Sequence, residues 1–391
     1  MFSRRTQWNL EENRLTRLLR EKRRQGVPLA DFTEANPTRC GFSASAAVLE
    51  LLSRPGSRFY NPDPKGALSA REAIAGYYAE QSIRVSPEQI LLTSGTSEAY
   101  AHLFQLLCDP GDSIITLHPS YPLFEHLAQL SDISLVSVAL RYDGEWHIDP
   151  EELRATVSDT SRGMILVHPH SPTGMLLKEA ARLQMESILL QHGCPIIADE
   201  VFSSYRHVND THAVRSFADS DSILTFTLNG LSKLAGFPQL KLGWIVVSGP
   251  ATLQQEALKR LEMISDTFLS VSAPVQLALP EILSALPSLT GPILERVLEN
   301  IGVLQKSVEG TPVSLLRPQG GWNAVLRMPA VLSDEDWCLQ FLENENVIVH
   351  PGYFFDFRGG EFVVLSLLPE TPEFEQGINR LMSAVSRIVL A

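Results

Sequence analysis

The stretch LLTSGTSEAYAHLF, Leu91–Phe104, joins an apolar run to a polar turn and then to a segment with apolar residues at helical spacing. This order is typical of a buried strand that leads into a crossover helix. Between Pro87 and Val247, apolar runs that end in polar or turn residues recur as QILLTSG, DSIITLHP, GMILVHP, CPIIADE, SILTFTL and LGWIVVSG. Continuous runs of this kind indicate parallel strands that are buried on both faces, with helices between them.

The chain after about Pro280 has a different pattern. A long helical segment is followed by the strand-like WNAVLRMP, the helix DEDWCLQFLENE, the strands VIVHPG and FVVLSLL, and a final helix. This mixture indicates a smaller α+β domain. The first residues precede the first clear helix of the large domain, SAREAIAGYYAEQ, and are expected to pack with the small domain. We therefore predict a large domain over residues 46–282 and a small domain formed by residues 1–45 and 283–391.

Composition and charge exclude several classes of partner. The chain is 44% hydrophobic and 20% charged, as in ordinary soluble globular proteins. Its net charge of −13 argues against nucleic acid, and the basic segment RLTRLLREKRRQG is expected to be a solvated helix face. Four scattered cysteines without metal-binding spacing suggest a reducing, cytoplasmic location. We expect no membrane contact, because neither a signal peptide nor an apolar run of about 18 residues is found.

Polar residues follow the predicted strands, at the edge of the sheet where ligands bind in parallel α/β proteins. Gly95, Thr96 and Ser97 lie between the first strand and the next helix. Backbone N–H groups, hydroxyls and the helix dipole converge there, which predicts a site for a phosphate or a carboxylate. A capped helix start with a turn glycine would give the same pattern.

Two further strand exits carry groups suited to a planar, cationic ligand. The segment PIIADEVFSSY places Asp199 and Glu200 at the end of a buried strand. A carboxylate there is costly without a partner such as a cationic ligand atom, although an N-cap role is the alternative. The segment LHPSYPLFEHL places Tyr121 at another exit, where its ring could stack on a planar ligand or join the core.

The segment HPHSPTGM, His168–Met175, is predicted to form a rigid turn with polar side chains that point at the same crevice. Two histidines at i and i+2, His168 and His170, could suggest a metal. Without a third ligand that indication is weak, so we predict no metal site.

The segment NGLSKLAGFPQLKLGW, Asn229–Trp244, presents Lys233 directly after Ser232 among small and apolar residues. A lysine in such surroundings tends to have a lowered pKa, which exposes the neutral amine needed for Schiff-base chemistry. A phosphate site, a strand-end aspartate, a stacking tyrosine and this lysine together point to pyridoxal phosphate as the cofactor.

With these motifs in this order, the chain resembles the class I/II aminotransferases, the aspartate-aminotransferase-like branch of the fold type I pyridoxal-phosphate enzymes. The resemblance extends over nearly the whole chain. It implies a three-layer αβα large domain with a mostly parallel sheet, and a smaller α+β domain formed by the N- and C-terminal segments. It also implies a homodimer with active sites at the subunit interface.

The resemblance assigns roles to individual residues. Lys233 matches the lysine that forms the Schiff base, and Lys241 stands where the family has a phosphate-binding arginine eight residues later. Asp199 matches the partner of the pyridine nitrogen, and Tyr121 matches the ring that stacks on the cofactor. The remaining cofactor-binding positions implied are Gly95, Thr96, Ser97, Ser171 and Ser232, together with Tyr60 from the neighbouring subunit.

The chain departs from the family pattern around the cofactor's phenolic oxygen and at the substrate carboxylate. Ser171 replaces the asparagine of the N-P-x-N-P-T-G turn, and Phe202 stands where many members place a tyrosine on the same oxygen. We expect this loss of hydrogen bonds to raise the pKa of the Schiff base. Val364 replaces the arginine that holds the α-carboxylate, and Arg39 or Arg358 could supply a charge from elsewhere.

These motifs predict an aminotransferase that moves an amino group from an amino acid to a 2-oxo acid through Lys233. A C–S lyase, or another elimination or synthase reaction, remains the alternative, because it begins from the same cofactor chemistry. A pyridoxal-phosphate-binding regulator would need a basic DNA-binding domain of about 60–70 residues or more ahead of the fold, whereas only about forty residues precede the large domain here. The resemblance places the substrate side chain near NPTRCGF, Trp322 and Tyr353.

Overall fold

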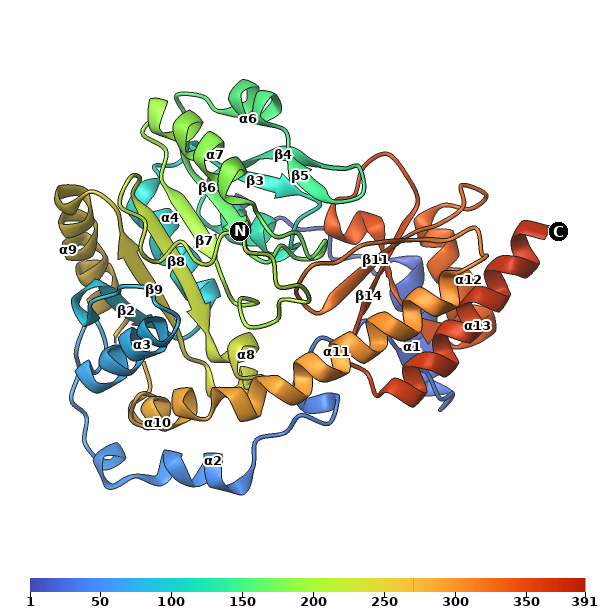
Figure 1. Ribbon diagram of the computed structural model, residues 1–391, viewed down its shortest axis with the longest axis horizontal. Helices are drawn as coiled ribbons and strands as arrows, with labels where there is room; N and C mark the ends of the chain where they lie inside the picture. The colour runs from blue at the N-terminus through green and yellow to red at the C-terminus, as the bar shows by residue number, and fades with distance from the viewer. Residues whose placement is uncertain (270, 391) are drawn as a thin grey trace.

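The central part of the chain forms a large sheet that lies beside a smaller one (Figure 1). The computed structural model describes residues 1–269 and 271–390. Within these residues the large sheet has eight strands, in the order β2-β9-β8-β7-β6-β3-β4-β5. They are β2 (Ile90–Thr93), β3 (Ser113–His118), β4 (Ser134–Tyr142), β5 (Trp146–Ile148), β6 (Ser161–Val167), β7 (Ile196–Asp199), β8 (Thr225–Gly230) and β9 (Gly243–Ser248).

The middle of the large sheet is parallel and its edges are antiparallel. Strand β3 pairs in parallel with β4 and β6, and β7 pairs in parallel with β6 and β8. All six apolar runs are strands, which confirms the mostly parallel α/β sheet. Strand β9 differs from the prediction: it runs antiparallel to β2 and β8, because the short connection from β8 returns it to the adjacent position. Strands β4 and β5 were not predicted, since β4 is only partly buried and lacks a continuous apolar run.

Helices cover both faces of the large sheet, as expected for parallel strands. On β6, Ile165 packs in one core cluster with side chains of α4, α5 and α9, whereas its neighbour Leu166 packs in another with α6 and α7. The helices are α1 (Arg14–Arg24), α2 (Ala46–Glu50), α3 (Leu68–Glu80), α4 (Thr96–Leu107), α5 (Leu123–Leu130), α6 (Pro150–Thr156), α7 (Glu179–Gln191), α8 (Leu231–Leu234), α9 (Ala251–Phe268), α10 (Ala273–Ser284), α11 (Leu286–Val308), α12 (Asp334–Glu345) and α13 (Thr371–Leu390). Short 3₁₀ helices are η1 (Arg4–Thr6), η2 (Pro37–Arg39), η3 (Leu51–Ser53), η4 (Pro55–Arg58), η5 (Pro87–Gln89), η6 (Pro238–Leu240) and η7 (Gly352–Phe355).

The smaller sheet is antiparallel and is built from the C-terminal part of the chain. Its order is β10-β11-β14-β13, with β10 (Ser314–Leu316), β11 (Asn323–Arg327), β13 (His350–Pro351) and β14 (Phe362–Ser366). Beside it, β1 (Ala30–Asp31) pairs in parallel with β12 (Val347–Ile348). The ring of Phe32 lies 4.9 Å from that of Phe374 on α13. The two ends of the chain therefore share one core.

The composition of that core supports the division into two domains. One hydrophobic cluster contains Ala30, Phe32 and Cys40 together with side chains of α11, α12, α13, β11 and β14. We therefore propose that residues 1–45 and 283–391 form the small domain and residues 46–282 the large one. Phe202 and Tyr205 pack against the same cluster and join the two parts.

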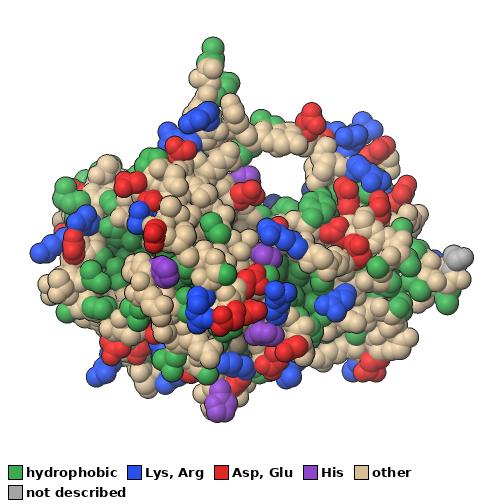
Figure 2. Space-filling view, turned by 90° about the horizontal axis from the view of Figure 1, so that it is seen from above, with side chains coloured by type: hydrophobic (Ala, Val, Ile, Leu, Met, Phe, Trp, Pro, Cys, Tyr) green, Lys and Arg blue, Asp and Glu red, His purple; other side chains and the backbone are tan. Residues whose placement is uncertain are grey.

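The surface carries both signs of charge. Acidic and basic side chains are intermixed over the face shown in Figure 2. Across residues 1–269 and 271–390, no single helix is long and apolar enough to cross a membrane, and α10 with α11 passes the same test only as a pair bent by 69°.

The contact between the two chain ends can be tested at Gly377 of α13. A Cβ atom there would lie 2.3 Å from Cζ of the buried Phe32 ring, so Gly377→Ala overpacks the core. We expect it to lower the free energy of unfolding by about 1–3 kcal/mol. Gly302→Ala on α11 meets no atom within 4 Å and should instead gain up to about 1 kcal/mol. Urea denaturation of both variants measures the difference, and equal stabilities would contradict this packing.

Candidate active site

Lys233 is presented by a tight connection at the end of the large sheet. Strand β8 ends at Gly230, and the short helix α8 carries Lys233. A Cβ atom on Gly230 would lie 3.0 Å from Cα of Gly243 on β9, so this close approach of two backbones requires glycine. The hydroxyl of Tyr205 donates a hydrogen bond to the Lys233 carbonyl at 2.9 Å. The backbone of the lysine is thereby fixed, and its side chain extends into a cavity.

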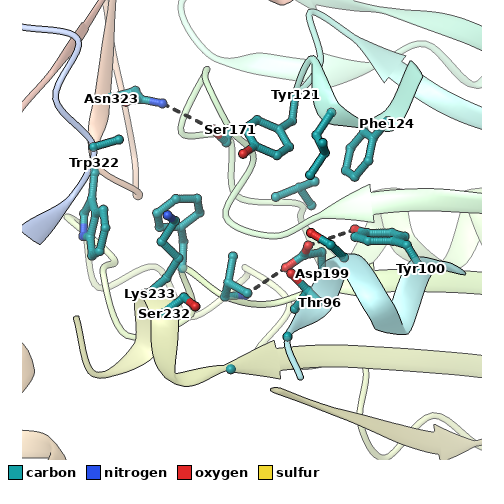
Figure 3. A pocket seen from close by; sticks show the side chains of 18 of the residues that line it. Thr96, Tyr100, Tyr121, Phe124, Ser171, Asp199, Ser232, Lys233, Trp322 and Asn323 are labelled. Carbon is teal, nitrogen blue, oxygen red and sulfur yellow. Dashed lines mark hydrogen bonds between the residues drawn. The ribbon is translucent and has the colours of Figure 1, made fainter. Parts of the chain in front are cut away.

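This cavity of about 290 Å³ lies between the carboxyl ends of the parallel strands and the small sheet (Figure 3). It brings together side chains from distant parts of the chain. Nine of the ten residues predicted for the cofactor line it: Gly95, Thr96, Ser97, Tyr121, Ser171, Asp199, Ser232, Lys233 and Lys241.

A cradle for an anion lies where β2 leads into α4. Gly95 has φ +139°, a conformation that side chains disfavour, and it precedes the first turn of a twelve-residue helix. A Cβ atom on Gly95 would lie 3.9 Å from Nζ of Lys241, so the lysine reaches the same place. The N–H groups at the helix start, the hydroxyls of Thr96 and Ser97 and the ammonium group of Lys241 form a donor set suited to a phosphate.

Asp199 is a buried carboxylate at the end of β7. Its Oδ2 accepts a hydrogen bond from the Tyr100 hydroxyl at 2.8 Å, and its Oδ1 accepts one from the Val201 N–H at 3.2 Å. Burial nevertheless raises the pKa of Asp199 to about 6, against the opposing effects of these two donors and of Lys233. The charged form would therefore be stabilised by a further cationic group in the cavity.

Burial has the opposite effect on the lysine. It lowers the pKa of Lys233 from its ordinary value, and the negative charge of Asp199 partly opposes that change. The Nζ atom lies 5.7 Å from the centre of the Trp322 ring. A lowered pKa makes the neutral, nucleophilic amine more accessible, as carbonyl chemistry requires.

The aromatic wall of the cavity includes the predicted stacking residue. Tyr121 is 46% exposed, and its ring contacts that of Phe124 edge-on at 5.9 Å. Phe202 packs edge-on against Trp322 at 5.4 Å. The position after β7 that the family often fills with tyrosine thus carries an apolar ring.

The structure adds Asn323 to the predicted set. Its Nδ2 donates a hydrogen bond to Oγ of Ser171 at 3.3 Å, and both residues line the cavity (Figure 3). Asn323 opens β11 of the small sheet. The only signal in the sequence is a polar residue at the start of an otherwise apolar strand, next to Trp322.

Several residues considered from the sequence lie elsewhere. Tyr60, the tenth cofactor residue, is 76% exposed and is not part of the cavity lining of this chain. Arg39 pairs with Glu34 at 3.3 Å, and Arg358 pairs with Asp356 at 3.0 Å, both with exposed guanidinium groups outside the lining.

Val364 does not contribute a polar group. It is 1% exposed and belongs to a core cluster together with Phe355 and Phe362. Of the described residues that line the cavity, Lys233 and Lys241 are the lysines, and none is an arginine.

The two histidines of the predicted turn make structural hydrogen bonds. His168 Nε2 lies 2.9 Å from the Val214 carbonyl, and His170 Nδ1 lies 2.9 Å from the Thr173 hydroxyl. Burial lowers the pKa of His168 to about 4 and that of His170 to about 3, so both rings are neutral. In the part of the chain that is described, no group of three or more potential ligands could hold a metal ion.

Glu200 differs from its neighbour Asp199 and does not line the cavity. Its carboxylate accepts hydrogen bonds from the Phe217 N–H at 2.6 Å and from the Ser216 hydroxyl at 2.8 Å. Burial still raises its pKa to about 7.

This raised pKa makes stability depend on pH. Between the ordinary pKa of 4.5 and about 7, the folded protein holds a proton on Glu200 that the unfolded chain releases, so stability falls as pH rises. We expect Glu200→Gln to remove about 3 kcal/mol of that fall. Denaturant unfolding of the cofactor-free protein at several pH values measures it. Glu295→Gln, on the exposed side of α11, is the control and should show the same dependence of stability on pH as the unsubstituted protein. If Glu200→Gln shows that same dependence, the expectation is refuted.

Comparison with known proteins identifies the family and the fold of the chain. The family model for aminotransferases of class I and II matches residues 29–375. Glutamate-pyruvate aminotransferase AlaA of Escherichia coli is 28% identical over 94% of both chains. Solved structures of an E. coli aminotransferase and of the alanine aminotransferase from Pyrococcus furiosus superpose with TM-scores of 0.88 and 0.89. The E. coli structure is 25% identical in sequence, and the alignment covers 99% of this chain and 98% of that chain. The P. furiosus structure is 20% identical, and the alignment covers 99% of this chain and 100% of that chain.

These findings confirm the fold type I architecture, the cofactor and the reaction class expected from the motifs. An amino acid and a 2-oxo acid are the substrates of that reaction class. The chain belongs to the class I and II aminotransferases and is a pyridoxal-phosphate-dependent enzyme of that family.

Proposed function

We propose that this aminotransferase prefers an amino donor with an apolar or aromatic side chain. The carrying observation is the wall of the cavity, which is formed largely by rings: Tyr121, Phe124, Phe202, Trp322, His350, Phe354 and Phe355. The two lysines of the lining lie at the positions proposed for the cofactor. An acidic side chain would therefore lose its hydration without gaining a cation from the described lining, at a cost of several kcal/mol. The name of the relative AlaA, a glutamate-pyruvate aminotransferase, includes an acidic amino acid, so the proposed preference would distinguish this chain from that relative.

The residues present fit pyridoxal phosphate. When bound, this cofactor supplies a ring that accepts the electrons released when a bond to the substrate's α carbon breaks. In the proposed arrangement, the cradle at Gly95 with Lys241 holds the phosphate, and Tyr121 covers the ring. The buried Asp199 keeps a proton on the ring nitrogen, and the two charges compensate each other.

Lys233 has two tasks in this arrangement. Its neutral amine would hold the cofactor through the aldehyde carbon, with loss of water, and once a substrate amine had replaced it there, the freed lysine amine would be placed to take a proton from the substrate's α carbon. The lowered pKa of Lys233 supports both tasks, because only the neutral amine can act as nucleophile and base.

We infer that the working enzyme is a homodimer in the cytoplasm. Tyr60 and its neighbour Phe59 are 76% and 72% exposed, and the nearby Leu49 is 50% exposed. Covering these side chains with a second copy would bring Tyr60 to the other subunit's phosphate cradle, as the family resemblance implies. The four unpaired cysteines support a reducing compartment.

The reaction can be tested by a single turnover. Enzyme loaded with pyridoxal phosphate is mixed with L-phenylalanine, L-leucine, L-alanine, L-aspartate or L-glutamate while its visible absorption and the products are followed. We expect the visible band to disappear with one equivalent of 2-oxo acid, at least about tenfold faster with the apolar donors than with the acidic ones. Lys233→Ala should show no such conversion. Accumulation of ammonia with an unchanged band would instead indicate elimination, and faster acidic donors would contradict the proposed preference.

The dimer can be tested at Tyr60. We expect sedimentation to give twice the mass of 43.3 kDa, and Tyr60→Phe to weaken pyridoxal-phosphate binding by about tenfold, because one hydrogen bond to the charged phosphate is lost. Tyr142→Phe on β4, outside the cavity lining, is the matched control and should bind as the unsubstituted protein does. A monomer that binds the cofactor equally well with either substitution would rule out the shared site.

A further inference from the structure

Ser171 and Asn323 meet across the two sheets. Ser171 belongs to the turn after β6 of the large sheet, whereas Asn323 is the first residue of β11 in the small sheet, 152 residues later. Their side chains point toward each other at the cavity wall (Figure 3). The Nδ2 atom of Asn323 donates to Oγ of Ser171 at 3.3 Å.

This direction of donation determines what the serine can do. A hydroxyl has one proton to donate and two lone pairs that accept. Because the asparagine amide fills a lone pair of Ser171, the hydroxyl proton stays available for an acceptor in the cavity. A hydroxyl that accepts a hydrogen bond is also polarised into a stronger donor.

The surroundings leave this donor an important role. Phe202, which also lines the cavity, offers an apolar ring that is packed on Trp322. The family resemblance implies that the phenolic oxygen of bound pyridoxal phosphate would lie near Ser171. A hydrogen bond to that oxygen stabilises its negative charge. It therefore lowers the pKa at which the visible absorption of the bound cofactor changes.

We propose that Asn323 is a positioning residue that acts through Ser171, so that the pair replaces the missing asparagine of the turn as the donor to the phenolic oxygen. This inference rests on the proposed function. It assigns the small sheet a part in tuning the cofactor, because the amide comes from β11 and not from the turn itself.

A double-mutant cycle tests the relay. Three variants are compared with the unsubstituted protein: Ser171→Ala, Asn323→Ala and the double variant. For each we measure the dissociation constant of the cofactor and the pKa at which the visible absorption of the bound cofactor changes. We expect either single substitution to raise that pKa by about half to one pH unit and to weaken cofactor binding by about threefold to tenfold. The double variant should resemble Ser171→Ala alone, because Asn323 has no further effect once the hydroxyl is gone.

Other outcomes are equally clear. An Asn323→Ala variant that matches the unsubstituted enzyme in both measurements overturns the proposal, as does an Asn323→Ala effect that keeps its size in the Ser171→Ala background. Thermal unfolding of the cofactor-free variants shows whether each folds. Failure of the proposed cofactor arrangement looks different, since the unsubstituted protein would then bind pyridoxal phosphate no better than Lys233→Ala does.

Discussion

A carboxylate that is buried at the end of a central strand is the constraint on which the site depends. Asp199 is only 6% exposed, so its charge is poorly solvated, and two hydrogen bonds do not fully offset that cost. The same burial destabilises the charged form of Lys233. A bound cofactor would stabilise both groups: its protonated ring nitrogen would compensate the charge of Asp199, and its aldehyde would react with the neutral amine of Lys233.

Close backbone contacts hold these groups in one place. Gly243 lies between two neighbours: a Cβ atom there would come within 3.0 Å of the Asn229 carbonyl oxygen and within 3.0 Å of the Gly95 Cα. The connection that carries Lys233, the strand that follows Lys241 and the turn of the anion cradle thus meet without intervening side chains. The distance between Lys233 and the proposed phosphate site is consequently set by the backbone.

The sequence allowed much of this arrangement to be predicted, for a physical reason. Parallel strands buried on both faces leave continuous apolar runs, and their carboxyl ends meet at one edge, so Gly95, Asp199 and Lys233 could be placed together from their positions after the runs. Asn323 could not be found this way. It belongs to the other sheet, and its contact with Ser171 depends on how the two sheets face each other, which no local pattern encodes.

The sequence could not show which charged side chains lie near the proposed substrate site. The sequence offered Arg39 and Arg358 as replacements for the arginine missing at Val364, yet each is paired with a neighbouring carboxylate at the surface. Net charge and motif spacing do not reveal which acidic residue an arginine will contact. Tyr60 is a similar case, because its proposed role requires a second chain.

The sharing of one core by both chain ends has a consequence for synthesis of the protein. Phe32 leaves the ribosome long before Phe374 and Gly377, against which it packs. The eight-stranded sheet can form while translation continues, whereas Phe32 has to wait until α13 has been made. Contacts of such sequence separation form slowly. Premature termination before α13 would therefore release a polypeptide in which the Phe32 ring stays uncovered and open to aggregation or proteolysis.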